Sequence, residues 1–544
     1  MIVESITLPI LAVIVVGALL AMTLRCLVSP FFSPLRHVPG PMAARFSRYW
    51  YMKRVSEGSF HKLNIQLHRQ HGTCEDELSG SKAGQWPRQD ERQLTTPNQG
   101  PIVRIAPNQF SIDDPEATKV IYGLAKGFVK SEWYKASGDP FAPHTDLFTD
   151  LNSTRHASNR RLVANLYSAT SLRNMEGDVD ECIDMLVTRL DQLAKSMQPF
   201  DLQFWMQSYA FDVIGQITLG KRFGILDEGA DKDDIFGNLH EYLKYCAVIG
   251  VYNELHRFLF WLMTKFPTKG LTGIGTFTVE QIDMSRNRRK NDPDSKTRMD
   301  FLSRTMGLHE KNPAKFPLAA VQSTCLVNIG AGSDTTSISL CSILYNLMTH
   351  PDALHKLRDE IDQKLEELGG ATRIPFKDTQ TMPYLQACIK EALRLHPATG
   401  LPLARVVPKG GATISGTYFP QGTVVGINTW VAHRNPQVFG EDVEAFRPER
   451  WLDSDKQRLS AMEACWMPFG AGSRTCIGKN ISLLEMNKLV PVLAREFDFV
   501  ACDPSKVTYE DYWLVKQRNM MCKVSRRGPR EMDIVTTMAN DASA

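Results

Sequence analysis

Apolar residues recur at helical spacing along most of this chain, which predicts a mainly α-helical protein. Two short regions, residues 103–112 and 412–427, instead alternate apolar and β-branched residues between Gly and Pro, which predicts strands and turns. We therefore expect one large domain over residues 42–525 that is mainly α with a small β-rich region.

The longest internal apolar run covers residues 318–348 and carries a single charged side chain, Asp334. The run is long enough to cross a bilayer. However, Gly, Ser, Asp and Thr residues gather at its centre, which suits a buried core helix opened around a ligand better than a helix facing lipid. A charge in the middle of a buried helix needs a partner or a function. Asp334 is therefore a candidate functional residue.

A second apolar run, residues 6–24, has no charged residue and would form about 28 Å of helix, close to one hydrocarbon thickness. We expect residues 1–28 to form a single N-terminal transmembrane helix, followed by a proline-rich hinge over residues 29–41. Arg25 and Arg36 follow the run, so the positive-inside tendency places the rest of the chain in the cytosol. A cleaved signal peptide is the alternative, but its basic start and short apolar core fit poorly.

Composition narrows the class of protein. With 544 residues, 43% hydrophobic content and a formal net charge of +3, the chain can bury a large core, and nucleic acid is not an expected partner. Eleven cysteines without paired spacings argue for a reducing compartment rather than a disulfide framework. Most of these cysteines are expected to be small buried hydrophobes.

Residues 469–478, Phe-Gly-Ala-Gly-Ser-Arg-Thr-Cys-Ile-Gly, place one cysteine in a glycine-rich loop just before an apolar helical segment. The thiolate of Cys476 could serve as an axial ligand of haem iron. A thiolate ligand donates electron density to the iron and so favours oxygen activation. Phe469 could cover the sulfur, Arg474 could pair with a haem propionate, and Gly478 would let the next helix approach the porphyrin. For an isolated cysteine, an inert core role would be more common. A zinc site lacks further ligands at the required spacing, and a phosphate-binding loop lacks its Gly-Lys-Ser/Thr ending.

The loop matches the haem signature Phe-x-x-Gly-x-Arg-x-Cys-x-Gly, and with it the chain resembles the cytochrome P450 superfamily, which implies that family's fold. Residues 384–396 contain the Glu-x-x-Arg pair of the same family, Glu391 and Arg394. The resemblance implies that Arg450 joins this pair in a buried structural cluster. Taken alone, such an i, i+3 pair would be an ordinary surface pair on a helix.

Residues 331–336, Ala-Gly-Ser-Asp-Thr-Thr, resemble the distal helix motif of the family. The resemblance implies that Gly332 leaves room for dioxygen, that Thr335 donates a hydrogen bond to the oxygen ligand of the iron, and that Asp334 relays protons from solvent. Breaking the O–O bond consumes two protons, and an acid beside an alcohol can deliver them in a pocket closed to water.

Two further arginines match propionate-binding positions of the family. Arg160 ends the stretch His-Ala-Ser-Asn-Arg, in which His156 replaces the tryptophan of the family motif, and Arg405 follows the Glu-x-x-Arg helix. A solvated surface role would be at least as common for either arginine alone. The implied cofactor is haem b, with Cys476 as its axial ligand and Arg160, Arg405 and Arg474 around its propionates.

Residues 73–100 interrupt the resemblance. The segment has no Ile, Val, Phe or Tyr and is rich in charged residues, Gln, Gly and Pro, so it cannot bury a core face. Removing it restores the family's usual connection from His-Gly to Pro-Ile-Val-Arg-Ile, and we interpret it as a retained intron. A disordered surface loop is the alternative. The tail, residues 526–544, is polar enough to be disordered.

The resemblance implies a fungal microsomal haem-thiolate monooxygenase, which inserts one atom of O2 into a lipophilic small molecule. It also implies a single-pass protein of the endoplasmic reticulum membrane with its catalytic domain in the cytosol. Residues 128–134 and 403–411 are similar to the pisatin demethylase-like group, which suggests secondary metabolite biosynthesis. A haem-thiolate isomerase or dehydratase is the alternative, since it could dispense with the proton relay, and a non-catalytic haem sensor is a second one.

The chain has no dinucleotide-binding fingerprint, so we expect electrons from a separate NADPH-dependent flavoprotein reductase. Basic residues near the cysteine loop in sequence could form its docking face, with an ordinary solvated surface as the alternative. These residues are Arg447, Lys456, Arg458, Arg474, Lys479 and Lys488. The substrate pocket is expected around residues 128–151, 200–260, 401–403 and 513–514.

Overall fold

The computed structural model describes residues 30–71, 101–124, 126–266, 270–290 and 299–528, together with residues 17, 27 and 28. None of the helices in these ranges combines the length and the apolar character that a membrane span requires. The predicted anchor over residues 1–28 lies almost entirely outside the described residues, as do the segment 73–100 and most of the tail. Those three predictions therefore stay predictions.

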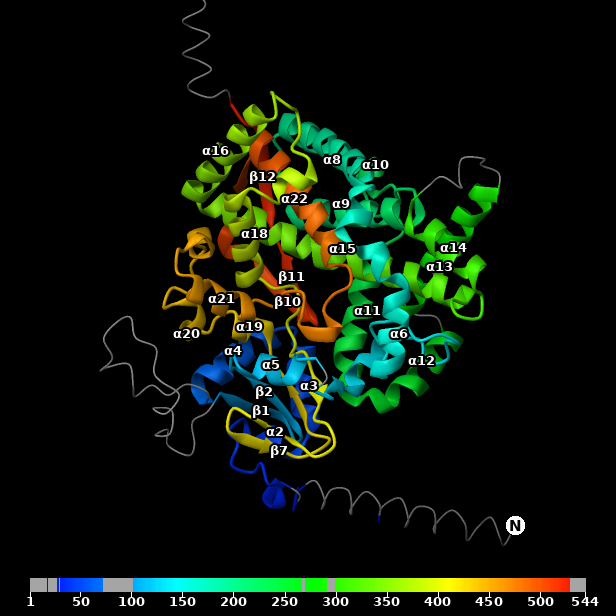
Figure 1. Cartoon of the computed structure of the whole chain (residues 1–544), viewed down its shortest axis with the longest axis vertical. Coiled ribbons are helices and arrows are strands. Elements are labelled where there is room, and N and C mark those ends of the chain that lie inside the picture. The colour runs from blue at the N-terminus through cyan, green and yellow to red at the C-terminus, as the bar shows by residue number, and fades with distance from the viewer. Residues whose placement is uncertain are drawn as a thin grey trace, which may run out of the picture.

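Helices dominate the described chain, as the apolar spacing predicted (Figure 1). The α-helices are α2 (Met42–Phe46), α3 (Arg48–Ser56), α4 (Phe60–His71), α5 (Ala117–Tyr122), α6 (Ser153–Val163), α7 (Ala169–Arg173), α8 (Glu176–Ser196), α9 (Leu202–Leu219), α10 (Ile225–Glu228), α11 (Ile235–Ile249), α12 (His256–Lys265), α13 (Leu271–Lys290), α14 (Phe301–Lys311), α15 (Leu318–Thr349), α16 (Pro351–Glu367), α17 (Phe376–Thr379), α18 (Pro383–Leu395), α19 (Thr429–Ala432), α20 (Pro436–Phe439), α21 (Lys456–Cys465) and α22 (Lys479–Glu496). Short 3-10 helices are η3 (Glu132–Ser137), η4 (Ala164–Tyr167), η5 (Gly250–Leu255), η7 (Pro448–Leu452), η8 (Gly472–Arg474) and η9 (Pro504–Lys506).

The strands form small sheets, of which the largest lies in the strand-rich lobe at the foot of Figure 1. They are β1 (Ile102–Ala106), β2 (Gln109–Ile112), β3 (Val129–Lys130), β4 (Phe200–Asp201), β5 (Arg405–Val406), β6 (Ala412–Ile414), β7 (Thr417–Phe419), β8 (Val424–Gly426), β9 (Phe497–Ala501), β10 (Thr508–Tyr512), β11 (Leu514–Arg518) and β12 (Met521–Arg526). The five-stranded sheet has the order β1-β2-β8-β5-β3 and is antiparallel except for the β2/β8 pair. Both predicted strand regions are confirmed by this sheet and by the β6/β7 hairpin.

The long helix α15 passes through the middle of the molecule, with α9 packed along it (Figure 1). It begins after Pro317 and ends just before Pro351, which opens α16. This placement confirms a buried core helix, because most of its side chains from Ser333 to Leu347 are inaccessible. The partner helix α9 is capped by Asp201, whose side chain accepts a hydrogen bond from the Gln203 amide.

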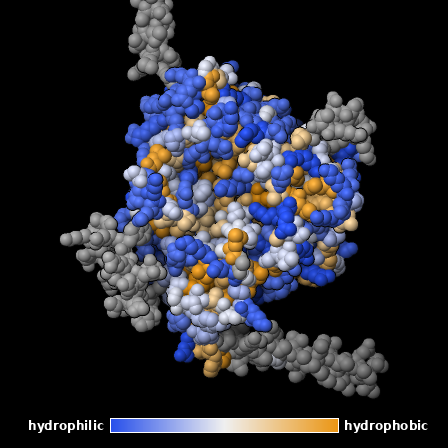
Figure 2. Space-filling view, viewed as in Figure 1, coloured by the Kyte–Doolittle hydropathy of each residue, from blue (hydrophilic) through white to orange (hydrophobic). Residues whose placement is uncertain are grey.

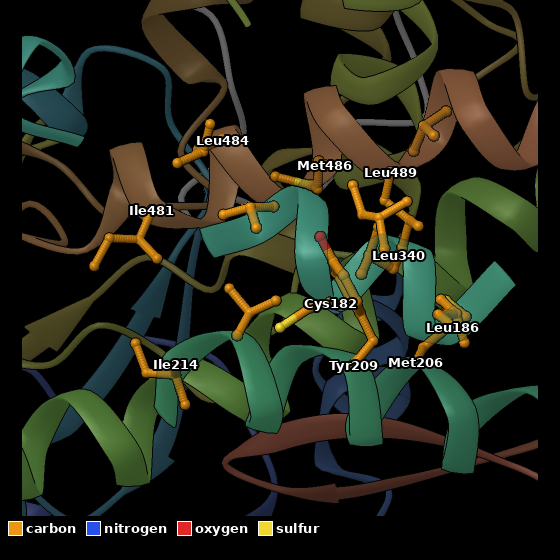
Figure 3. Close-up of a cluster of buried hydrophobic side chains, with 14 of the residues drawn as sticks. Cys182, Leu186, Met206, Tyr209, Ile214, Leu340, Ile481, Leu484, Met486 and Leu489 are labelled. Carbon is orange, nitrogen blue, oxygen red and sulfur yellow. The ribbon is translucent and has the colours of Figure 1, made fainter. Parts of the chain in front are cut away.

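The main core lies where α8, α9, α15 and α22 meet. Figure 3 shows side chains from these four helices pointing toward one another, with the Tyr209 hydroxyl directed at α22. Cys182, Leu340 and Leu484 are fully buried in this cluster. Burying one such side chain contributes about 1.5–3 kcal/mol, so the core holds the helices that carry the functional residues in fixed positions.

Candidate active site

The cysteine loop leads directly into α22 and is held by backbone contacts. The Cys476 amide donates to the Phe469 carbonyl at 2.8 Å, which closes the loop around the cysteine. Gly472 has a φ of +68°, and a Cβ there would lie 1.8 Å from the carbonyl oxygen of Tyr122. Only glycine fits this position, because the backbone of the neighbouring segment occupies the space of a side chain.

Backbone amides and a positive charge surround the sulfur of Cys476. Burial raises the pKa of its thiol, while the backbone amides of Gly478 and Lys479 and the charge of Arg160 act to lower it. Cys476 nevertheless keeps accessible surface, whereas all but one of the other described cysteines are buried. The accessible side of the sulfur therefore faces a space that protein largely surrounds, where a bound metal would stabilise the thiolate.

Basic side chains from separate elements converge near this cysteine. Lys130 on β3, His156 and Arg160 on α6, Arg405 on β5 and Arg474 on η8 perturb one another electrostatically. His156 and Arg160 share a face of α6 because they are four residues apart. Burial, and then the charges of Arg474, Arg160 and Lys130, lowers the pKa of His156 to about 4, so this imidazole is neutral.

Carbonyl oxygens supply most of the hydrogen bonds to this group. Arg474 donates to the Asp150 carbonyl at 2.7 Å, and its other terminal nitrogen, Nη2, is buried with no partner among the described residues. Lys130 donates to the Phe148 carbonyl at 2.6 Å, and burial, followed by the charges of Arg405 and Arg474, places its pKa well below the ordinary value. Arg405 is 4% exposed and donates to the carbonyls of two neighbouring residues.

A buried group of cations with an unpartnered guanidinium nitrogen requires an anion. The nearby carboxylate of Asp150 does not neutralise this group, because Asp150 is already bound by Arg155 at 2.7 Å. A flat macrocycle with two propionates, held at one side by Cys476, fits both the cationic group and the accessible sulfur. The residues present therefore fit haem, whereas no described group of three or more His, Cys, Asp or Glu side chains could hold a bare metal ion.

The structure brings Glu391, Arg394 and Arg450 together in the core beside the loop. Arg394 binds both carboxylate oxygens of Glu391 at 2.8 and 2.9 Å, and Arg450 binds one at 2.8 Å. All three side chains are fully buried. Trp451 Nε1 and the Arg447 amide also donate to the same carboxylate, at 2.9 and 3.1 Å. The fivefold coordination satisfies a charge that would otherwise be costly to bury.

His433 links this cluster to the cysteine loop. Its Nε2 accepts from the Met467 amide at 2.9 Å, and its Nδ1 donates to the Arg394 carbonyl at 3.1 Å. Burial, aided by the charge of Arg394, lowers the pKa of His433 to about 3. The neutral imidazole thus connects Met467, two residues before the loop, to α18, which carries Glu391 and Arg394.

One face of α15 stays open at its middle. Val327, Ala331 and Thr335 follow one another at i, i+4 and are at least partly accessible, whereas Ser333, Asp334 and Thr336 are buried. Thr335 Oγ1 donates to the Ala331 carbonyl at 2.8 Å. A hydroxyl on an open helix face can also accept or pass on a proton.

The role predicted for Gly332 is wrong. A Cβ at this position would lie 2.8 Å from the side chain of Ile214 on α9, so the glycine faces the helix crossing. Its small size allows α9 and α15 to approach closely rather than leaving room for dioxygen. The accessible positions Ala331 and Thr335 lie about 60–100° around the helix from Gly332.

Asp334 points away from that open face. Its carboxylate is fully buried and forms an ion pair with Lys516 on β11 at 2.9 Å. Gln207 on α9 donates to the same oxygen, Oδ1, at 2.5 Å. The other oxygen, Oδ2, has no partner among the residues that the structure describes. Asp334 is thus not open to solvent, as a direct relay would require.

Two residues of the predicted docking face lie in the interior. Lys488 is 3% exposed and pairs with Glu176 and Asp180 at 2.7 and 3.1 Å. Arg474 belongs to the cationic group beside the cysteine. Both are therefore corrected: Lys488 is buried and paired, and the guanidinium of Arg474 is half-buried within the cationic group beside the cysteine. Of the others, Arg447 remains on the surface but is bound to Asp442 at 2.6 Å.

Sequence reasoning missed Lys130 and Lys516, and it treated His156 only as a substitution in a motif. Lys130 lies between two aromatic rings, 4.2 Å from the centre of Tyr134 and 4.0 Å from that of Phe148. The nearby aromatic residues in the sequence were the only available signal.

Comparisons with known proteins identify the family of the chain. A cytochrome P450 family model matches residues 97–523. The chain is 38% identical over 493 residues to pisatin demethylase of Fusarium vanettenii, which covers 89% of this chain and 88% of that protein. It is 34% identical over 515 residues to the cytochrome P450 monooxygenase pkfB of Emericella nidulans, covering 92% and 93%. It is also 35% identical over 480 residues to a cytochrome P450 monooxygenase of Aspergillus terreus, covering 85% and 90%.

Proposed function

Because the chain belongs to the cytochrome P450 family, whose members bind haem b through a cysteine thiolate, we propose that it is a haem-thiolate monooxygenase of fungal secondary metabolism. It inserts one atom of O2 into a lipophilic small molecule. The observation that supports this most strongly is the accessible Cys476 sulfur opposite a buried cationic group that lacks an anion. A pisatin demethylase and fungal monooxygenases among its relatives support the pathway class.

The bound haem would supply oxygen activation and accept electrons, and the chain supplies the rest. Cys476 would hold the metal, and the amides of Gly478 and Lys479 would stabilise the charge on its sulfur. Lys130, Arg160, Arg405 and Arg474 would bind the propionates, with His156 as a neutral hydrogen-bonding neighbour. These residues would bind the cofactor and fix its orientation.

Thr335 is the group placed to hand protons to the reacting oxygen, because it lies on the open face of α15. Aromatic residues from two of the predicted pocket segments, 128–151 and 513–514, contact one another. Trp513 lies 5.4 Å from Trp133 and 4.9 Å from Phe148, measured between ring centres. A lipophilic substrate suits such surroundings, since apolar rings contribute contact area without hydrogen-bonding demands.

Membrane attachment through residues 1–28 and a cytosolic catalytic domain in the endoplasmic reticulum belong to the same proposal. The described chain begins with exposed apolar side chains, including Phe31 and Phe32 at 64% and 81% exposure. Figure 2 shows apolar surface at the foot of the molecule. Exposed aromatic residues after an apolar run suit a position near the lipid headgroups. Protease protection of microsomes would test this: the domain should be digested without detergent.

The function is tested by expressing the full chain with an NADPH-dependent flavoprotein reductase in a host lacking this gene. Lipophilic precursors are supplied under 18O2, and products are followed by mass spectrometry. The proposal predicts a thiolate-type carbonyl spectrum and products that gain one labelled oxygen atom. Products formed without labelled oxygen would favour an isomerase or dehydratase, and a haem spectrum with no product from any precursor would favour a sensor.

A further inference from the structure

A cavity of about 420 Å³ lies between α4, α19, the end of α15 and the β10/β11 hairpin. Its volume is within the range of about 300–1,000 Å³ that small-molecule sites occupy. Figure 1 shows α4 and α19 side by side, and together they form one wall. Among the described residues, neither Cys476 nor any member of the cationic group beside it lines this cavity.

The cavity is also separate from the open face of α15. Ser342 and Asn346 line it from α15, seven and eleven residues after Thr335. At 1.5 Å per residue, they lie about 10 and 16 Å along the helix from Thr335. A molecule in this cavity would therefore occupy a second site rather than the haem pocket.

The rim of the cavity carries more positive than negative charge. Lys62 and Arg69 are exposed on α4, and Arg434 lies on the opposite wall. Glu444 is the one carboxylate among the lining residues, and it binds Arg69 at 2.8 Å and Arg434 at 3.0 Å. Lys62 lies 5.1 Å from the ring centre of Tyr509 and forms no ion pair with any described residue. An anion at the rim would meet an attractive field.

The walls of the cavity are aromatic. Trp430 comes from α19, Tyr345 from α15 and Tyr509 from β10. The ring of His396 lies between two of them, 4.8 Å from the centre of Trp430 and 5.3 Å from that of Tyr509. Rings pack on other rings with a gain beyond the area that they bury, so a flat aromatic ligand suits these walls.

The floor of the cavity presents hydrogen-bond acceptors. Gln517 on β11 is 1% exposed and donates from Nε2 to the Ile338 carbonyl at 3.0 Å, which fixes the orientation of its amide. Its Oε1 is buried with no partner among the described residues. His396 donates from Nε2 to the Val515 carbonyl at 2.8 Å, so its Nδ1 is an acceptor in the neutral ring. Burial lowers the pKa of His396 to about 3, which keeps the ring neutral.

A buried acceptor without a donor is costly, so the floor requires a donor from a ligand. We propose that this cavity binds a second small molecule, a hydroxylated aromatic carboxylate. Its carboxylate pairs with Lys62, its ring lies against Trp430 and Tyr509, and its hydroxyl donates to Gln517 Oε1. The proposal goes beyond the monooxygenase function and does not rest on it, because none of these contacts involves the haem site.

Equilibrium dialysis of the full-length, haem-loaded protein with 4-hydroxycinnamate tests the proposal. We expect saturable binding of one molecule per chain. Cinnamate, which lacks the hydroxyl, should bind about two- to tenfold more weakly, as expected for one lost hydrogen bond. The neutral 4-hydroxycinnamyl alcohol should bind about two- to fivefold more weakly, because it cannot pair with Lys62. An azole that ligates the iron should fill the haem site without displacing 4-hydroxycinnamate.

Variants assign the contacts. Lys62→Met should weaken binding of 4-hydroxycinnamate about two- to fivefold and leave that of the alcohol unchanged. Lys53→Met is the matched control, because Lys53 is an exposed lysine on α3 that does not line the cavity, and it should bind like the wild type. Gln517→Leu should remove the difference between 4-hydroxycinnamate and cinnamate. If this buried variant fails to fold, Lys62→Met on the exposed face of α4 and the ligand series still decide.

Four results would overturn the proposal. They are an absence of saturable binding, displacement of 4-hydroxycinnamate by the azole, equal affinities of Lys62→Met and Lys53→Met, and an undiminished preference for the hydroxylated acid in Gln517→Leu. Dialysis needs no turnover, so a failure of the proposed monooxygenase function would leave this test intact.

Discussion

Glu391→Gln is the sharpest test of what holds the haem-side core together. The substitution keeps the shape of the side chain but removes the only carboxylate that Arg394 binds in the described structure. It also turns an amide NH2 toward donors, since Arg450 and Trp451 donate to the same two oxygens. Removing one partner of a buried ion pair costs about 3–5 kcal/mol. We expect a loss within this range, because Arg394 loses its counter-ion, while Arg450 keeps the carboxylate of Asp442 at 3.2 Å.

Denaturant unfolding of the haem-loaded protein, followed by fluorescence and by the haem absorbance, would measure the loss. Glu57→Gln is the matched control, because Glu57 binds Arg54 at 2.9 Å in an i, i+3 pair with both side chains 39% exposed. Such a surface pair contributes about 0.2–1 kcal/mol. If the two substitutions shifted the unfolding midpoint equally, the structural role of the buried cluster would be refuted.

Three further predictions concern stability and ligation. Gly332→Ala should destabilise the protein by about 1–3 kcal/mol, because the added Cβ meets Ile214. Gly330→Ala, whose Cβ would have nothing within 4 Å, should stabilise it by about 0.5–1 kcal/mol, so the two substitutions should shift the unfolding midpoint in opposite directions. Burial lowers the pKa of His433 to about 3, so the unfolded chain takes up a proton first as the pH falls below about 6.5. Stability should then fall by roughly 1.4 kcal/mol per pH unit toward pH 3, and His433→Gln should lack this part of the slope in denaturation series at several pH values. Cys476→Ser should abolish the thiolate-type carbonyl spectrum, and an unchanged spectrum would exclude Cys476 as the ligand.

Local sequence patterns predicted the elements that depend on neighbours along the chain. Apolar spacing identified α15 as a buried helix, and alternation identified the strands around β2 and β8. The spacing of the cysteine loop was readable because its turns need glycine at fixed positions, as Gly472 illustrates.

Contacts between distant segments were not readable. In the sequence, Lys516 looks like an ordinary lysine of an exposed strand. Its burial and its pairing with Asp334, 182 positions earlier, become visible only when β11 is placed against α15. Lys488 looked like a surface cation, although its apolar neighbours along α22 were a signal of burial. Gly332 was assigned to the wrong side because helix direction relative to the pocket depends on how α9 crosses α15.

The cationic group around Arg474 links cofactor supply to the survival of the polypeptide. Before haem arrives, like charges crowd together and one guanidinium nitrogen lacks an acceptor, so the newly made chain is under repulsion. Two incoming propionates would remove that repulsion, and ligand binding to the native state alone shifts folding by mass action. A cell starved of porphyrin should therefore accumulate less of this protein at unchanged transcript level, because its unloaded form is an easier target for proteolysis.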